Sequence, residues 1–347
     1  MKHYYPLFKP KHVGICGGTK LKQENALFCQ YLGTELAQEE NLIIMTGGFK
    51  NIKSKDQIPS ADYSTILGVN KIITDKNLLE SRVETLIPDP KYENPEIERF
   101  YSGKKIVLEN KSLQARRFML VNKADVLIAV EGAKGTREMI DLAFAIEKPC
   151  LPIPFTGGFA RDKWFQNKQI ICEWFDITPQ QAEDLESIKL TNCNENELRK
   201  EAQKIKYMIL EKLKRKCFII MPFRKEYDNF FNHIKDILHK EGFEPIRTDK
   251  MALVGNIVDM IRQGLYSSDC IIAEITERTP NVMYEIGLAH AFGKPVIMFI
   301  KGNIITNLPF DIVNERVFLY NELEDIDTNL SDLLQKVNQI SVPIQTG

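Results

Sequence analysis

The sequence predicts an α/β protein with two Rossmann-like parallel-sheet domains joined by a helical linker. With 347 residues, the chain is long for a single hydrophobic core. Both halves alternate short apolar runs, typical of buried strands, with stretches of helical period. A polar, turn-rich segment and one amphipathic helix separate the halves. We therefore expect domains at residues 1–176 and 215–347, with a linker at 177–214.

Five apolar runs in the first half predict strands, and helical patterns lie between them. The expected strands are 12–16, 41–46, 105–109, 125–130 and 150–154, and the expected helices are 22–39, 111–123 and 136–147. The segment 50–98 is polar and proline-rich with weak periodicity. We expect it to form an excursion over the sheet edge, and whether it acts as a lid stays open.

The helix expected at 195–216 carries one apolar stripe. Its apolar residues follow one another at steps of four, three, four and four: Leu198, Ala202, Ile205, Ile209 and Leu213. This spacing predicts an amphipathic helix. It is either a linker helix packed on one domain, or a lever or dimer seam.

The second half repeats the alternation in one compact α/β unit. Expected strands are 217–223, 244–247, 270–275, 296–300 and 316–320, with helices near 227–240, 253–267, 280–293 and 329–339.

Composition excludes several classes of function. The net charge of −1 provides no basic field for direct nucleic-acid binding. The seven cysteines are scattered without a CxxC pair, which predicts reduced thiols, no metal site and a cytoplasmic location. No run has the length of a membrane span, and the N-terminus lacks the apolar region of a signal peptide.

Glu285 occupies an unusual place in the helix expected after the strand 270–275. Thr279 suits the N-cap and Pro280 the first helical position. The residues three and four steps from Glu285 are mostly apolar, which puts its carboxylate on or beside the buried stripe. Such a carboxylate is unfavourable unless it has a partner or lies at a cleft. The helix also starts at the carboxyl edge of the sheet, where ligands bind. The alternative is a glutamate favoured by the helix dipole and paired with an arginine.

Three motifs of the second half, MPF, CIIAEIT and PNVMYEIGLAHAFGKPV, together resemble the nucleoside 2-deoxyribosyltransferase-like family, a relative of bacterial TIR-like domains. The resemblance covers about residues 215–320. It implies that Glu285 is the nucleophile or ribose-binding carboxylate in cleavage of an N-glycosidic bond. It also implies that Glu274, where the family has aspartate, holds ribose hydroxyls, and that Asn281 orients Glu285. Glu274 and Glu285 are thus expected to act as a pair of carboxylates in one site.

Four further residues are candidate substrate contacts. Pro222 and Phe223 end the first strand of this half and could cover the base, or form a plain strand-to-turn boundary. Arg224 could meet a phosphate or be a solvated turn arginine. Asp249 leaves the second strand with Arg247 toward the same edge, as a substrate contact or as part of an internal ion pair.

Glycines follow four strands of the first half: Gly17 and Gly18, Gly47 and Gly48, Gly132 and Gly135, and Gly157 and Gly158. Glycine there lets a ligand approach the backbone, and helix N-termini attract phosphate. We expect a nucleotide-sized anion site, although no P-loop or GxGxxG is present. The expected binding residues are Gly17, Gly18, Thr19, Gly47, Gly48, Gly132, Gly135 and Thr136.

The stretch QARRFMLVNKADVLIAVEGAKGTREM resembles the arginine-bearing helix and PGGxGTxxE motif of the SLOG superfamily, which includes LOG phosphoribohydrolases. The resemblance covers about residues 10–175. Met139 stands where the family has its catalytic glutamate, and Glu138 comes one place early. The resemblance thus implies a nucleotide sensor rather than a second enzyme, with Glu138 among the binding residues. Arg116 or Arg117 could grip phosphate, or face solvent.

Together these features predict a nucleotide N-glycosidase controlled by a nucleotide signal. NAD is the first candidate, as substrate rather than cofactor, and the expected signal is a cyclic ADP-ribose-like molecule or a cyclic nucleotide. In similar bacterial proteins this pairing belongs to anti-phage defence. We expect a homo-oligomer that rearranges through the 195–216 helix. The alternatives are a constitutive nucleoside deoxyribosyltransferase or nucleotide N-ribohydrolase, and a non-catalytic nucleotide-binding adaptor.

Overall fold

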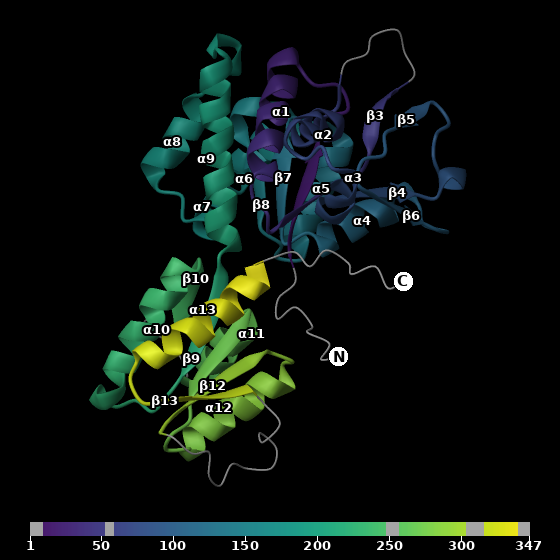
Figure 1. Cartoon of the computed structure of the whole chain (residues 1–347). Helices are drawn as coiled ribbons and strands as arrows, with labels where there is room; N and C mark the ends of the chain where they lie inside the picture. The colour runs from purple at the N-terminus through teal and green to yellow at the C-terminus, as the bar shows by residue number, and fades with distance from the viewer. Residues whose placement is uncertain (1–9, 53–58, 248–256, 303–315, 339–347) are drawn as a thin grey trace. The chain divides into compact units, whose positions relative to one another are not determined.

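The structure, a computed structural model, describes residues 10–52, 59–247, 257–302 and 316–338. It divides into two compact units, the first ending at Leu213 and the second beginning at Lys214. Each unit is built around one parallel sheet flanked by helices (Figure 1), which confirms the predicted fold class.

The sheet of the first unit has six parallel strands in the order β6-β4-β2-β1-β7-β8. They are β1 (Lys11–Gly17), β2 (Leu42–Thr46), β4 (Val83–Pro88), β6 (Lys104–Leu108), β7 (Val126–Val130) and β8 (Cys150–Ile153). The chain runs outward from β1 to β6 and then returns to the other side of β1 with β7. This reversal of strand order makes a crevice at the carboxyl ends of β1 and β7, the usual ligand position in open α/β sheets.

Helices cover both faces of this sheet. Because side chains alternate along a strand, Val13 and Ile15 of β1 enter one hydrophobic core and Cys16 enters the other. The first core is completed by α1, α2 and α6–α9, and the second by α4 and α5. Their bounds are α1 (Gln23–Ala37), α2 (Ala61–Ile72), α4 (Leu113–Lys123), α5 (Lys134–Ala145), α6 (Gly158–Gln166), α7 (Lys168–Phe175), α8 (Pro179–Ser187) and α9 (Glu195–Leu213).

The prediction that 50–98 lies over the sheet edge was wrong for β4. This strand is an internal member of the sheet, pairs with β2 and β6, and is buried along its whole length. It was missed because two of its buried residues are polar. Glu84 forms an ion pair with Lys123, and the Thr85 hydroxyl donates to the Ser102 carbonyl at 2.8 Å.

The rest of that segment is also ordered into regular elements. It contains α2, α3 (Lys76–Arg82) and β5 (Ile97–Arg99). The strand β5 pairs antiparallel with β3 (Phe49–Ile52), apart from the main sheet.

The polar stretch after residue 176 likewise holds a helix, α8. It begins with a capping box in which Gln181 N–H donates to the Thr178 hydroxyl and Thr178 N–H donates to the Gln181 side chain. Pro179 occupies its first turn, and Ala182 and Leu185 are buried. The Thr-Pro-x-Gln pattern could have predicted this helix from the sequence.

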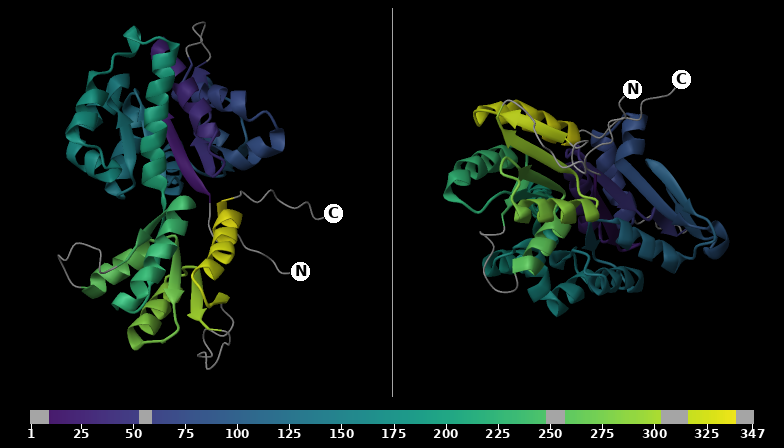
Figure 2. Two further views of the ribbon diagram at one scale, coloured as in Figure 1. Left: turned by 60° about the vertical axis from the view of Figure 1, so that its left-hand side comes forward. Right: turned by 90° about the horizontal axis from the view of Figure 1, so that it is seen from below.

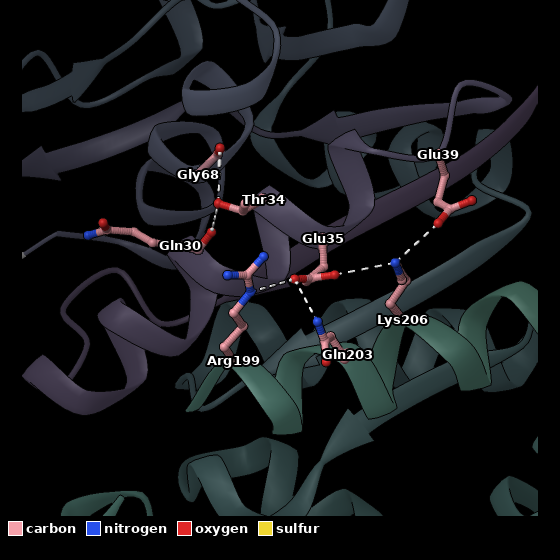
Figure 3. A network of polar contacts seen from close by, with 8 residues as sticks. All are labelled: Gln30, Thr34, Glu35, Glu39, Gly68, Arg199, Gln203 and Lys206. Atoms are coloured by element: carbon pink, nitrogen blue, oxygen red, sulfur yellow. Dashed lines mark hydrogen bonds and ion pairs between the residues drawn. The ribbon is translucent and has the colours of Figure 1, made fainter. Parts of the chain in front are cut away.

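The helix α9 belongs to the first unit and packs along α1 (Figure 2). Its predicted apolar stripe lies in the first core. Glu35 of α1 is buried at the seam and accepts hydrogen bonds from Arg199 Nε at 3.1 Å, Gln203 Nε2 at 3.2 Å and Lys206 Nζ at 3.3 Å (Figure 3). Lys206 also pairs with Glu39 at 3.2 Å. The helix is therefore packed on one domain, while a role as a lever or dimer seam stays a prediction.

The second sheet has five parallel strands in the order β10-β9-β11-β12-β13. They are β9 (Arg215–Ile220), β10 (Phe243–Ile246), β11 (Cys270–Glu274), β12 (Val296–Lys301) and β13 (Arg316–Tyr320). Their order reverses at β9, so the crevice lies at the carboxyl ends of β9 and β11. One face packs on α10 (Asp228–Lys240) and α13 (Glu324–Asn338), the other on α11 (Ile257–Ser267) and α12 (Pro280–Ala291).

Candidate functional site

The first unit contains a cavity of about 370 Å³ at the carboxyl ends of β1 and β7. This is the crevice that the strand order predicts. Seven of the expected binding residues line it: Gly17, Gly18, Thr19, Arg116, Arg117, Gly135 and Thr136.

The turn between β7 and α5 gives this cavity a helix N-terminus. Glu131 and Gly132 both have positive φ, 51° and 91°, and a Cβ on Gly132 would overlap the Thr136 hydroxyl. Gly132 thus shapes the turn and is not in the cavity lining. The N-cap residue of α5, Ala133, makes no side-chain hydrogen bond to the first backbone amides of the helix. Amides at a helix N-terminus that no side chain caps can bind an anion.

Arg116 explains the glycine pair after β2. Its guanidinium lies so close to Gly47 that a Cβ there would overlap it. Gly48 has a φ of 67°, a backbone conformation that suits glycine. Neither glycine lines the cavity, so their role is to accommodate Arg116 and the turn rather than to touch a ligand.

Arg116 is the most unusual charge in the cavity. The residue is only 8% exposed, and no hydrogen bond or ion pair reaches it from the part of the chain that the structure describes. Burial lowers its pKa to about 10, with Asp62 opposing that shift and Arg99 and Arg117 adding to it. It therefore stays protonated at neutral pH. A buried cation without a protein partner is a position for an anion from outside.

The two neighbouring arginines are already neutralised. Arg99 binds Glu93, with Nε 3.0 Å from Oε2, and donates to the Gly47 carbonyl at 2.7 Å. Arg117 forms an ion pair with Glu138. Glu138, expected among the binding residues, is outside the cavity lining and partners an arginine instead.

Met139 lines the cavity at the position where the sequence resemblance led us to look for a catalytic glutamate. A thioether cannot transfer protons, so this position contributes only an apolar surface.

Asp62 is a cavity residue that the sequence analysis missed. It lies in the first turn of α2, is 8% exposed, and its Oδ2 accepts from Phe49 N–H at 3.2 Å. Burial raises its pKa, and Arg116 opposes that rise. Asp62 lies in the segment 50–98, which the sequence analysis expected to lie over the sheet edge, and it belongs to no motif. No sequence signal therefore pointed to it.

In the second unit, α12 begins at Pro280 after Thr279, as predicted. Glu285 is 5% exposed, on a helix whose Val282, Ile286 and Ala289 enter the core. Within the described residues no hydrogen bond or ion pair reaches its carboxylate. Burial alone raises its pKa to about 7. The alternative of a glutamate paired with an arginine is therefore not realised in this part of the chain.

Glu274 is buried in a different way. This last residue of β11 accepts from Thr276 through both the backbone N–H, at 3.3 Å, and the hydroxyl, and from the Tyr320 hydroxyl at 3.3 Å. Burial raises its pKa, whereas these hydrogen bonds lower it. Glu274 is thus a satisfied carboxylate that ties the strand to the following loop.

The two carboxylates lie toward different faces of the sheet. Along β11, Cys270 and Ile272 enter the core under α10 and α13, and Ile271 and Ala273 enter the core under α12. Alternation places Glu274 on the α10 side, with Tyr320, while Glu285 is carried by α12. No contact between described atoms joins them, so the structure does not bring the predicted pair together.

The other predicted contacts lie near the end of β9. Pro222 is buried, whereas Phe223 is 51% exposed. Arg224 Nη1 pairs with Glu277 at 2.9 Å and Glu226 at 3.3 Å, and the Tyr227 hydroxyl donates to Glu277 at 3.0 Å.

Two predicted residues remain. Asn281 is exposed in the first turn of α12, and Asp249 lies outside the described residues. Arg247, at the end of β10, pairs with Asp228 at 3.0 Å. This ion pair is internal to the unit. Whether Asp249 contacts substrate or joins an internal ion pair stays a prediction.

The described residues contain no group of three or more histidine, cysteine, aspartate or glutamate side chains that could hold a metal ion. No helix among them is long and apolar enough to cross a membrane.

No protein-family model and no curated protein matches the sequence. Among solved structures, the structural-genomics target TM1055 is 24% identical over 44% of this chain and 79% of its own, with a TM-score of 0.34. The CMP N-glycosidase BcmB of Clostridium botulinum is 18% identical over 33% of this chain and 97% of its own, with a TM-score of 0.28. A 2-deoxyribosyltransferase of Bacillus psychrosaccharolyticus is 17% identical over 32% and 90%, with a TM-score of 0.27.

Proposed function

We propose that the second unit cleaves the N-glycosidic bond of a nucleoside or nucleotide, with Glu285 as the carboxylate that meets the ribose C1′ atom. The observation that supports this most is the burial of Glu285, on the helix that follows β11, without a hydrogen-bond or ion-pair partner among the described residues. NAD is the first candidate substrate. A carboxylate kept without a partner is unfavourable for stability, which is the ordinary signature of a group retained for chemistry.

The chemistry suits a carboxylate with a raised pKa. When the bond between C1′ and the base nitrogen breaks, its electron pair leaves with the base and positive charge develops on the ribose. Ionised Glu285 stabilises that charge or bonds to C1′. Water then adds its hydroxyl to C1′, releases a proton and frees the carboxylate. With a pKa of about 7, Glu285 is substantially ionised at neutral pH and can also accept that proton.

Glu274 receives a supporting role in this proposal. Its hydrogen bonds with Thr276 and Tyr320 fix the loop that leads from β11 to α12. Thr276 in turn accepts from Lys301 N–H at 2.8 Å, which ties the loop to β12. The resemblance predicts that Glu274 holds ribose hydroxyls. The contacts instead favour a residue that positions the helix carrying Glu285.

In the first unit, we propose that Arg116 binds the phosphate of a nucleotide signal, either cyclic ADP-ribose-like or a cyclic nucleotide. The support is a formed cavity lined by the buried Arg116, whose guanidinium has no hydrogen-bond or ion-pair partner within the described ranges. Signal-dependent control of the second unit, a homo-oligomer and a place in anti-phage defence are proposed from the family resemblance alone.

Incubation of the purified full chain with NAD tests the proposal. The reaction is run with and without a panel of cyclic nucleotides and cyclic ADP-ribose isomers, and released nicotinamide is measured by chromatography. Release only with one activator supports a sensor that controls an enzyme. Release without an activator indicates a constitutive enzyme, and deoxyribose transfer between bases would make it a transferase.

A non-catalytic nucleotide-binding adaptor is the second candidate. The separation of Glu274 and Glu285 on different faces of the sheet favours it, because the predicted carboxylate pair is not assembled. The absence of turnover on NAD, nucleosides and nucleoside monophosphates, with retained binding in the first unit, would decide for the adaptor.

A further inference from the structure

Asp62 and Arg116 line the same cavity with opposite charges, yet they do not pair. Both side chains belong to the lining of this one cavity. Each also shifts the pKa of the other, so they are close enough to interact. Among the described residues, however, no ion pair or hydrogen bond joins them. Two buried opposite charges are normally stabilised by direct contact. Here both remain available to a third group that enters the cavity.

We propose that Asp62 determines the specificity of this cavity by selecting anions that carry a hydrogen-bond donor, such as a ribose hydroxyl, over anions without one. The inference rests on the proposed function of the cavity as a phosphate site. It goes further by naming the residue that would recognise the ligand group next to the phosphate. A phosphorylated ribose would satisfy Arg116 with its phosphate and Asp62 with a hydroxyl. An anion without a donor would satisfy Arg116 alone and be repelled by Asp62 wherever Asp62 is ionised, the state that the nearby Arg116 cation favours.

The Asp62 carboxylate has acceptor capacity left for this role. An ionised carboxylate offers about four acceptor positions. In the described part of the chain Phe49 N–H donates to its Oδ2 at 3.2 Å. The Gly47 backbone N–H also interacts with the carboxylate and, like Phe49 N–H, lowers its pKa. Both amides belong to one turn, which leaves other acceptor positions of the carboxylate for a ligand.

Asp62 is also held firmly in place. Ser60 caps α2 by accepting from Tyr63 N–H at 3.0 Å. Ala61 N–H donates to the Gly18 carbonyl at 2.9 Å, which ties the start of α2 to the turn after β1. A Cβ on Gly17 would overlap Ala61, so these two segments pack closely. A carboxylate fixed in this way can discriminate between ligands, because it cannot move aside for the wrong one.

A structural role is the alternative explanation. Asp62 could serve only to hold β3 through Phe49 N–H and to favour the N-terminus of α2 through the helix dipole. In that case its replacement would lower stability without changing which anions bind.

The experiment compares two probes, sulfate and ribose 5-phosphate, by isothermal titration calorimetry with the full chain at one pH and ionic strength. Wild-type protein is expected to prefer ribose 5-phosphate. Asp62→Asn should reduce that preference by roughly tenfold or more, because ribose 5-phosphate loses a charged hydrogen bond and sulfate loses a repulsion. Asp62→Ser, which also removes the charge, serves if the first variant does not fold. Asp75→Asn, at the cap of α3 and outside the cavity lining, is the matched control.

The outcomes separate this inference from the proposed function. If wild-type protein binds neither probe, the phosphate site itself is wrong, and Asp62 selects nothing. If it binds both and the Asp62 variants leave the preference between them unchanged, the specificity role is overturned while the phosphate site stands.

Discussion

Arg116 in the first unit and Glu285 in the second are both buried ionisable groups without a protein partner in the described structure, and they differ in what burial does to them. A guanidinium with a pKa of about 10 keeps its proton at neutral pH, so only an incoming anion can compensate its charge. A carboxylate with a pKa of about 7 can take up a proton instead. The first arrangement suits binding and the second suits chemistry in which a group changes its charge. Variants at the two groups should therefore separate a binding role from a catalytic one.

Replacement of Glu285 by glutamine should abolish turnover. The amide keeps the shape of the side chain but cannot stabilise or bond to the ribose C1′ atom, so the rate should fall by roughly 10³-fold. Base release from NAD or a nucleoside monophosphate is the measurement, with exposed Glu244→Gln as the matched control in the same unit. Retained turnover in the Glu285 variant, at equal folding, would remove Glu285 from the reaction.

The same variant should change how stability depends on pH. The folded-state pKa of Glu285 is raised from 4.5 to about 7, so its contribution to stability is fully present below pH 4.5 and is lost as pH rises through 7. Wild-type protein should thus lose about 3 kcal/mol relative to Glu285→Gln across this window. Both tryptophans, Trp164 and Trp174, lie in the first unit, so hydrogen exchange of peptides from α12 is the suitable measurement. If the stability of wild-type protein and of Glu285→Gln depends on pH in the same way, burial does not raise the pKa of Glu285.

The two adjacent arginines of α4 should differ in ligand binding. Arg116→Gln should weaken binding of AMP roughly 30-fold or more, because it removes the cation that no group in the described part of the chain compensates. Arg117→Gln should change the dissociation constant by no more than about threefold, since Glu138 already neutralises Arg117. Calorimetry of the two variants side by side measures the contrast. Equal losses would mean that the cavity acts through its summed charge rather than through Arg116.

Much of the fold was predictable because apolar runs mark buried strands, and almost every strand of both main sheets lies at its predicted place. The exception is β4. Its buried Glu84 and Thr85 are polar residues that pair with Lys123 and Ser102, so the strand does not appear as an apolar run in the sequence. The site was less predictable, because neighbours on a helix such as Arg116 and Arg117 differ in environment only once the helix is packed. The Glu274–Glu285 pair was predicted from the family resemblance, together with the position of the Glu285 helix at the carboxyl edge of the sheet. Side chains alternate between the two faces of the sheet along β11, which places Glu274 on the face opposite to the helix that carries Glu285. This alternation follows from the sequence of the strand and argued against the pair.

The smallest expected effect concerns Gly47, which touches no ligand in the proposed site. A methyl group there would overlap the Arg116 guanidinium, so Gly47→Ala should displace it and weaken AMP binding by about threefold to tenfold. Gly287→Ala on α12, where a Cβ meets open space, is the matched control. If Gly47 acts only through Arg116, its replacement should have no further effect in the Arg116→Gln background. Additive losses in the double variant would mean that the turn after β2 contacts the ligand itself, and the cavity would then bind its anion through backbone as well as through Arg116.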